Sequence, residues 1–326
     1  MQHDCLPRRP VVGIDVAKDK LDVFVDDDDL PARRSLSVAN DDAGRAALVD
    51  ELRRADVLLV CVEATGRYHR RLAADLLDAG IPVAVVNPQR VREYARATGR
   101  LEKTDPIDAR VLAEFARAVG PRREEKLPEK QVELRDLVSR RRALVQVRVA
   151  EKNRLADDAP KLARAQAQKL LRVVERQIDD LDRAIAKLAE RDDDWNHKAG
   201  LIASVKGVGA ATANQLVAEL PELGRLDRQQ IAKLVGVAPL NCDSGRRRGQ
   251  RHIRGGRHDG RVTLYMGAFN AIQHNPRFRD FAERLVAAGK PFKVIVTAAM
   301  RKLLVILNQM VKTNTPWNPA LAFQFR

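Results

Sequence analysis

Short apolar runs separated by amphipathic stretches fill the first third of the chain. Apolar runs of about four to eight residues between turn signals are typical of strands, whereas apolar residues three and four apart are typical of helices. The predicted strands are residues 11–16, 21–25, 35–38, 57–62 and 82–86. The predicted helices are residues 41–54, 68–78, 89–97 and 105–118. Strands that first follow one another and then alternate with helices predict an α/β domain with a mixed sheet flanked by helices.

The middle of the chain changes to long helical patterns. A helical, arginine-rich stretch at 129–156 is followed by a proline-containing break at 157–160. In the next stretch, six apolar residues recur at spacings of three and four: Leu171, Val174, Ile178, Leu181, Ile185 and Leu188. This period of about 3.5 residues is typical of a left-handed coiled coil. Two long helices around a turn predict either an antiparallel hairpin or a dimerising arm.

The last third is mostly helical, with one basic insertion. An arginine- and glycine-rich stretch at 244–261 interrupts helical patterns at 201–219, 227–236, 261–273, 277–288 and 291–311. The three patterns divide the chain into an α/β domain at 1–120, a helical arm at 121–195 and a small helical domain at 196–326.

Composition narrows the class of protein. The 326 residues are 45% hydrophobic, which excludes wholesale disorder. The longest near-continuous apolar run, residues 57–62, is far shorter than the ~20 residues of a membrane span, so we expect no membrane partner. The chain opens on a polar, basic segment rather than a signal peptide. Three widely spaced cysteines predict neither a disulfide framework nor a cysteine-rich zinc site, and a cytoplasmic location follows.

The positive charge is unevenly distributed. The formal net charge is +15, of which residues 1–120 carry −2, residues 121–200 carry +4 and residues 201–326 carry +13. An excess of this size in one segment favours a polyanionic partner, and nucleic acid is the commonest one. A basic surface that serves only solubility is the alternative.

Four carboxylates stand at informative positions in the first domain. Asp15 interrupts an apolar strand, Glu63 directly follows another, and Asp105 and Asp108 lie three apart at a helix start. Residues three apart share one face of a helix, so two strands and a helix can bring these acids together. Converging carboxylates would bind one or two Mg²⁺ ions, which suit phosphoryl transfer. The alternative is that each acid is a surface or capping residue.

Eight spaced motifs carry a family resemblance. In the first third they are Gly13-Ile14-Asp15-Val16-Ala17-Lys18, Glu63-Ala64-Thr65-Gly66-Arg67-Tyr68, Asn87-Pro88 and Lys103-Thr104-Asp105-Pro106-Ile107-Asp108-Ala109-Arg110. In the last third they are residues 202–211, 234–239, Asp243-Ser244-Gly245 and 255–268. In this order they resemble the DEDD transposases of the insertion-sequence-110 family, which are related to the Piv/MooV invertases.

The resemblance implies a fold, a site and a partner. It implies a RuvC-like, RNase H-like fold for the first domain, with Mg²⁺ bound by Asp15, Glu63, Asp105 and Asp108. It implies that Ser244 is a nucleophile. Members of the family are DNA recombinases of bacterial mobile elements, thought to be directed by an element-encoded bridge RNA, and the invertase relatives flip a DNA segment. A location in the bacterial cytoplasm, at the nucleoid, follows from this.

The neighbours of Ser244 fit attack on a phosphate. A serine hydroxyl is a weak nucleophile unless it is activated, and a transferring phosphoryl group needs positive charge around it. Seven arginines follow within a short span: Arg246, Arg247, Arg248, Arg251, Arg254, Arg257 and Arg261. Attack by Ser244 on a DNA phosphodiester would give a phosphoserine link and release a 3′ hydroxyl. Without the resemblance, Asp-Ser-Gly is an ordinary turn.

Other basic groups are candidates for nucleic-acid contacts. Lys103 precedes the paired aspartates, and Lys206-Gly207-Val208-Gly209 between two helical stretches resembles a helix-hairpin-helix, whose amides bind phosphates. An ordinary tight connection is the alternative for the second motif. The arm carries further arginines that bind phosphate or form a solvated face: Arg140, Arg141, Arg142, Arg148 and Arg154.

The leading hypothesis is a Mg²⁺-dependent DNA transposase that acts through a serine–phosphate intermediate. Recombination holds at least two duplexes together, so we expect a homo-oligomer, a dimer or tetramer, bound to DNA and a guide RNA. The acids and Ser244 would meet within one chain or between chains. Two alternatives stay open: a RuvC-like Mg²⁺-dependent endonuclease or junction resolvase without serine chemistry, and a non-catalytic nucleic-acid-binding protein.

Overall fold

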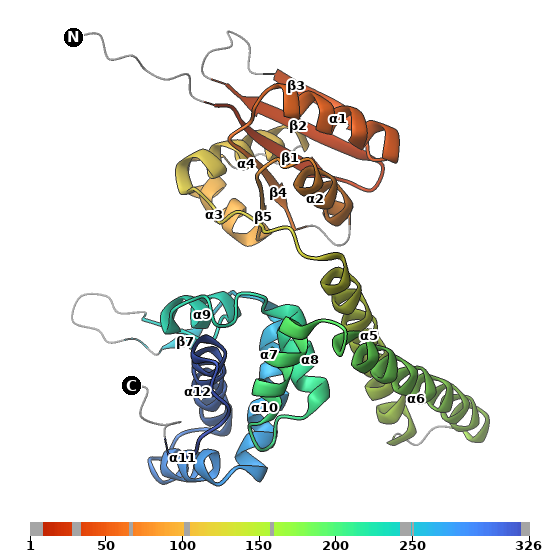
Figure 1. Ribbon diagram of the computed structural model, residues 1–326, viewed down its shortest axis with the longest axis vertical. Coiled ribbons are helices and arrows are strands. Elements are labelled where there is room, and N and C mark those ends of the chain that lie inside the picture. Colours follow the sequence, from red (N-terminus) through yellow and green to blue (C-terminus); the bar gives the residue numbers. More distant parts are fainter. Residues whose placement is uncertain are drawn as a thin grey trace. The chain divides into compact units, whose positions relative to one another are not determined.

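The computed structural model describes residues 9–27, 34–64, 68–100, 105–156, 160–241, 249 and 251–320 (Figure 1). They form two compact units, of which the first ends at Leu127 and the second begins at Pro128. The arm and the C-terminal helices belong to one unit by their contacts, and the predicted division near residue 195 stays a prediction.

The first unit contains a five-stranded mixed sheet. Its strands are β1 (Val11–Val16), β2 (Lys20–Asp26), β3 (Arg34–Ala39), β4 (Leu59–Glu63) and β5 (Val83–Val86). They lie side by side in the order β3-β2-β1-β4-β5, with β1, β2 and β3 antiparallel and β1, β4 and β5 parallel. The predicted mixed sheet is confirmed.

Helices cover both faces of this sheet (Figure 1). One face packs against α1 (Asp42–Arg54) and α2 (Tyr68–Asp78), and the other packs against α3 (Pro88–Ala97) and α4 (Asp105–Val119). Side chains alternate between the faces of a strand. In β1, Ile14 therefore joins the α1–α2 core, whereas its neighbours Gly13 and Asp15 are on the α4 face.

Helix α4 lies unusually close to β1 because of a glycine. A β-carbon on Gly13 would lie 2.0 Å from the Ala109 carbonyl oxygen and 2.5 Å from the Ala113 nitrogen. Further along α4, Arg117 Nε donates to Asp26 Oδ2 at 2.7 Å. Since Asp26 pairs with the first residue of β1, α4 runs antiparallel to β1. The beginning of α4 therefore lies toward the end of β1.

The second unit begins with two long helices, α5 (Glu129–Ala156) and α6 (Lys161–Ala189). They are antiparallel: Gln131 lies beside Asp192, Arg141 binds Asp182, and Lys152 lies 3.4 Å from Glu175. The six regularly spaced apolar residues from Leu171 to Leu188 form the predicted seam of α6. Two of them, Val174 and Ile178, pack with Leu144 of α5. Of the two predicted arrangements, the structure thus contains the antiparallel hairpin within one chain.

Six shorter helices complete the described part of the second unit. They are α7 (Asp193–Ala203), α8 (Ala210–Glu219), α9 (Arg228–Val235), α10 (His258–His274), α11 (Pro276–Ala287) and α12 (Phe292–Thr313). Two strands of two residues each, β6 (Pro239–Leu240) and β7 (His252–Ile253), form a small hairpin that was not predicted. Strands this short carry no hydrophobic periodicity.

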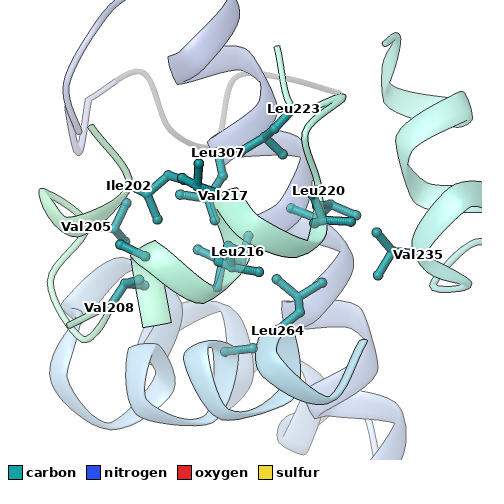
Figure 2. Packing of buried hydrophobic residues seen from close by; sticks show 14 of the residues in the cluster. Ile202, Val205, Val208, Leu216, Val217, Leu220, Leu223, Val235, Leu264 and Leu307 are labelled. Carbon is teal, nitrogen blue, oxygen red and sulfur yellow. The ribbon is translucent and has the colours of Figure 1, made fainter. Parts of the chain in front are cut away.

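The core of this unit forms around α8, α10 and α12 (Figure 2). Val205, Leu216, Leu264 and Leu307 are buried there. Among the described helices, α12 is the one long and apolar enough to cross a membrane, and 56% of its apolar stretch is buried within the protein. Arg301 and Lys302 divide the apolar sequence of α12, so each of its uninterrupted apolar runs is short.

Candidate active site

Asp15 and Glu63 occupy neighbouring strands at one end of the sheet. The parallel register pairs Gly13 with Cys61 and Ile14 with Val62, so the next position on each strand is Asp15 or Glu63. Because side chains alternate, both acids belong to the face on which Gly13 meets α4. Both are half-buried. The predicted convergence of these two acids thus follows from strand register.

The beginning of α4 brings the second pair of acids to the same end. Asp105 is the first residue of α4, and Asp108 lies one residue before Ala109, which packs on Gly13. Asp108 is half-buried, and the side chain of Asp105 lies outside the described part of the chain. Among the described residues, no group of three or more Asp, Glu, His or Cys side chains is arranged to hold a metal ion. Metal binding by the four acids stays a prediction.

Cys61, two residues before Glu63 on β4, carries a buried thiol. Cys61 is fully buried, and burial together with the charge of Glu63 raises the pKa of its thiol to about 12. The thiol is therefore protonated at neutral pH and packs as an apolar group in the core beside α4.

A fifth acid, Asp22, lies on this face and was not predicted as a site residue. It pairs directly with Asp15 across the antiparallel β1–β2 ladder. The alternation of β2 could have indicated it, since Asp22 shares a face with Phe24, which packs on α4. Only the register with β1 places it beside Asp15.

The predicted nucleophile lies outside the described residues, as do four of the predicted phosphate contacts. These residues are Ser244, Lys103, Arg246, Arg247 and Arg248. Strands β6 and β7 pair on either side of the stretch that contains Ser244, with Pro239 opposite Ile253. Arg251 and Arg254 near β7 are exposed.

Two of the predicted phosphate contacts, Arg257 and Arg261, form hydrogen bonds within the protein, and their contact with phosphate stays a prediction. Both terminal nitrogens of Arg257 lie 2.6 Å from the carboxylate oxygens of the buried Glu222, and Nη1 also donates to the Glu219 carbonyl at 3.0 Å. Arg261 donates to the Gly255 carbonyl. These bonds fix the backbone where the arginine-rich stretch enters α10.

Glu219 is the centre of a polar network that joins α5, α8 and α10. Arg142 Nη1 lies 2.9 Å from Glu219 Oε1, and its Nη2 lies 2.6 Å from Asp259 Oδ2. Thr263 Oγ1 donates to Glu219 Oε2 at 2.9 Å, and Gln215 Nε2 donates to Oε1 at 3.1 Å. In this structure Arg142, predicted to contact phosphate or solvent, therefore ties the arm to the C-terminal helices.

Stability should depend on the ionisation of Glu219. Burial raises the pKa of its carboxyl above the ordinary 4.5, against hydrogen bonds and Arg142, which lower it. A raised pKa means that the folded state binds the proton more tightly, so the carboxyl's stabilising contribution is lost as pH rises through that pKa. The free energy of unfolding of Glu219→Gln, relative to that of the parent, should therefore be greater at neutral pH than at pH 4.5. Urea unfolding at both pH values measures this difference. Glu190→Gln, at an exposed position, should show no such change. A Glu219→Gln difference that is the same at both pH values would contradict this.

The predicted helix-hairpin-helix turn packs closely on α10. Gly207 has φ +96°, and a β-carbon there would lie 2.8 Å from the Ala271 Cα atom. Gly209 is the N-cap of α8, and Lys206 is exposed. The glycine at 207 is thus required by packing within the protein. A contact of this turn with phosphate stays a prediction.

Comparisons with known proteins match nearly the whole chain. A model of DEDD transposases of IS110 type, described as "Transposase", matches residues 12–162, and one described as "Transposase IS116/IS110/IS902 family" matches residues 199–283. A pilin gene-inverting protein of Moraxella bovis is 27% identical over 80% of this chain and 82% of its own length. Its counterpart in Moraxella lacunata is 26% identical over 94% and 97%. An uncharacterized 44.8 kDa protein of insertion element IS116 from Streptomyces clavuligerus is 26% identical over 95% and 96%.

An α/β domain with acids at one end of its sheet, followed by a basic helical unit that matches transposase models, defines an enzyme class: a DNA transposase or recombinase. The chain belongs to the IS110 family of transposases. DNA is accordingly its substrate, and the DEDD designation of the first model indicates the use of a divalent metal.

Proposed function

We propose that this enzyme cleaves and rejoins DNA of an insertion sequence through a covalent serine–phosphate intermediate, with Mg²⁺ bound by Asp15, Glu63, Asp105 and Asp108. The observation that carries this proposal is the strand register that sets Asp15 beside Glu63, at the end of the sheet toward which α4 begins. Carboxylates on three rigid elements are the ligands that Mg²⁺ prefers.

The fold supports an RNase H-like, RuvC-like assignment of the first domain. Three antiparallel strands followed by two parallel ones, in the order β3-β2-β1-β4-β5, place the acids of β1 and β4 on central strands. One or two Mg²⁺ ions at these acids would neutralise charge on a transferring phosphoryl group. The acids would hold the ions, and the close packing of α4 on Gly13 sets the spacing between helix and sheet.

Ser244 supplies the nucleophile of the proposed reaction. Its Oγ forms a bond to the DNA phosphorus and its proton passes to a base, for which Asp243 is adjacent in sequence. The bond from phosphorus to O3′ breaks, and O3′ takes up a proton and leaves as a hydroxyl. Attack of a 3′ hydroxyl on the phosphoserine then rejoins DNA and restores the serine. Arg251 and Arg254, with the arginines directly after Ser244, provide positive charge for the phosphate.

The partners of the proposed reaction are DNA and a bridge RNA, held by a homo-oligomer, a dimer or tetramer, in the bacterial cytoplasm at the nucleoid. The net charge of +13 on residues 201–326 supports a partner with many phosphates. The names of the two Moraxella relatives describe inversion of a pilin gene, and that of the Streptomyces relative an insertion element. Both inversion and transposition consist of the same cutting and joining steps.

One experiment separates this proposal from its alternatives. The protein is incubated with Mg²⁺, labelled DNA that carries the ends of the element, and RNA transcribed from the flanking non-coding segment. The products are then separated under denaturing conditions. We expect labelled DNA attached to protein through a peptide that contains Ser244. Cut DNA without attached protein would favour a nuclease that uses water, and uncut but bound DNA would favour a non-catalytic binding protein.

RNA guidance has its own test. We expect a discrete RNA to copurify with the protein from cells that carry the complete element. Changing the sequence of that RNA should redirect joining to a matching DNA site. Joining at an unchanged site would show that the protein itself selects its target.

A further inference from the structure

We propose that Asp22 is a fifth carboxylate ligand of the metal site, held by Lys20 until a divalent cation binds. This inference rests on the proposed function, because it concerns the same ions. It assigns a metal-binding role to a residue that is not one of the four acids predicted from the sequence.

The register of the sheet places Asp22 in line with the predicted acids. Asp22 on β2 is directly opposite Asp15 on β1, and Glu63 on β4 is at the matching position on the other side of β1. Directly opposed residues of antiparallel strands have Cα atoms about 4.5–5.5 Å apart and side chains on the same face. Three adjacent strands therefore carry a row of three carboxylates on the face that packs against α4.

Asp22 is buried, and Lys20, with which it forms an ion pair, is poorly placed to satisfy it. Asp22 is only 7% exposed, and its Oδ2 receives no well-directed hydrogen bond. Lys20 Nζ lies 2.9 Å from this oxygen, but the Lys20 side chain is 47% exposed. A buried carboxylate is costly unless it is paired and well hydrogen-bonded. An ammonium that is half-exposed and poorly directed can be replaced at Asp22 by another cation.

Asp26 on the same strand shows what a satisfied carboxylate looks like here. It shares the face of Asp22, is 6% exposed, and accepts a hydrogen bond from Arg117 Nε at 2.7 Å. Arg117 also donates to the Asp26 carbonyl at 2.6 Å. Two aspartates of similar burial thus differ in their partner. Asp26 binds a guanidinium that is fixed by two hydrogen bonds, whereas Asp22 binds the ammonium of a flexible lysine side chain.

The chemistry of the two cations explains how Lys20 would act. An ammonium is a compact, strongly hydrated charge on a flexible stem, so it moves to solvent at little cost. A divalent ion interacts with several carboxylates at once and carries twice the charge. Asp22 and Asp15 would therefore share the ion, and Lys20 would occupy its place near Asp22 when the ion is absent.

The test is a direct measurement of metal binding without DNA. Mn²⁺, which replaces Mg²⁺ at oxygen sites, is titrated into the full-length protein, and free Mn²⁺ is followed by electron paramagnetic resonance. Three isosteric variants are compared with the parent: Asp22→Asn, Asp15→Asn and Asp26→Asn. Circular dichroism of each variant establishes that it is folded.

We expect Asp22→Asn and Asp15→Asn each to weaken Mn²⁺ binding about tenfold or more, and Asp26→Asn to leave it unchanged. Unchanged binding in Asp22→Asn, with weakened binding in Asp15→Asn, would overturn the inference and leave the proposed function standing. Unchanged binding in both would overturn the metal site itself. Equal weakening by Asp26→Asn would overturn the inference, because any buried negative charge on β2 would then suffice.

Lys20→Gln decides the matter if Asp22→Asn is not folded, because Lys20 is too exposed for its loss to unfold the sheet. Removal of the competing ammonium should tighten Mn²⁺ binding severalfold. Where Asp22→Asn is folded, this gain should be absent in the Lys20→Gln/Asp22→Asn double variant. An unchanged Mn²⁺ affinity in Lys20→Gln would overturn the inference, as would a gain that persists without the Asp22 carboxylate.

Discussion

Ser244→Ala is expected to reduce DNA joining by at least about a thousandfold and to abolish the covalent protein–DNA adduct. The proposed reaction passes through a bond between Ser244 Oγ and phosphorus, and alanine has no atom that can form it. The substitution removes no charge, so DNA affinity at fixed salt should change less than about twofold. Joining is measured by quantitative amplification of the junction, and the adduct by denaturing electrophoresis.

Cys242→Ala is the matched control for this variant. It removes a nucleophilic atom two residues from Ser244, within the same stretch, and should leave both joining and adduct intact. A Ser244→Ala protein that still joins DNA would rule out the serine mechanism and favour direct attack by water or a 3′ hydroxyl at the carboxylate site.

Gly13→Ala is expected to destabilise the first unit by about 3 kcal/mol and to abolish joining. The added methyl would lie 2.0 Å from the Ala109 carbonyl oxygen, and a backbone atom cannot turn aside as a side chain does. Overpacking of a core costs typically about 1–3 kcal/mol, and contact with backbone belongs at the upper end. Helix α4 would have to move away from β1 and would take Asp105 and Asp108 with it. Urea unfolding measures the first effect, and Mn²⁺ affinity reports the displacement of the acids.

Gly200→Ala serves as the comparison. Gly200 lies within α7, and a β-carbon there would have no atom within 4 Å beyond the backbone of its own helix. Alanine inside a helix is favoured over glycine by roughly 0.8–1 kcal/mol, so this variant should be slightly more stable and fully active. Equal stability of the Gly13→Ala protein and the parent would mean that α4 does not determine the geometry of the acids.

The secondary structure was largely predictable because local signals agree along the chain. Helix α2 runs over the predicted residues, Tyr68–Asp78, and α1 begins after Asp41, whose carboxylate accepts a hydrogen bond from the Gly44 amide as an N-cap should. The seam of α6 was visible because its period is regular over nearly three heptads. The family motifs added what periodicity alone does not contain, namely which acids belong together.

Features that depend on distant partners were not predictable. The position of Asp22 beside Asp15 depends on the register of β2 against β1, and nothing within residues 21–25 specifies that register. Arg142 and Arg257 have the sequence context of phosphate contacts, yet each is bound to a glutamate far away in the chain: Arg142 to the half-buried Glu219, and Arg257 to the buried Glu222. The closeness of α4 to β1 likewise depends on how two segments nearly a hundred residues apart meet.

The network around Glu219 has a mechanical consequence. Arg142 of the arm binds both Glu219 of α8 and Asp259 in the first turn of α10, while Arg257, two residues before Asp259, is bound to Glu222. A displacement of the arm would therefore be transmitted to the beginning of α10, which follows the stretch that contains Ser244. A few charged contacts between helices that are distant in the chain would thus couple the position of the arm to that of the beginning of α10.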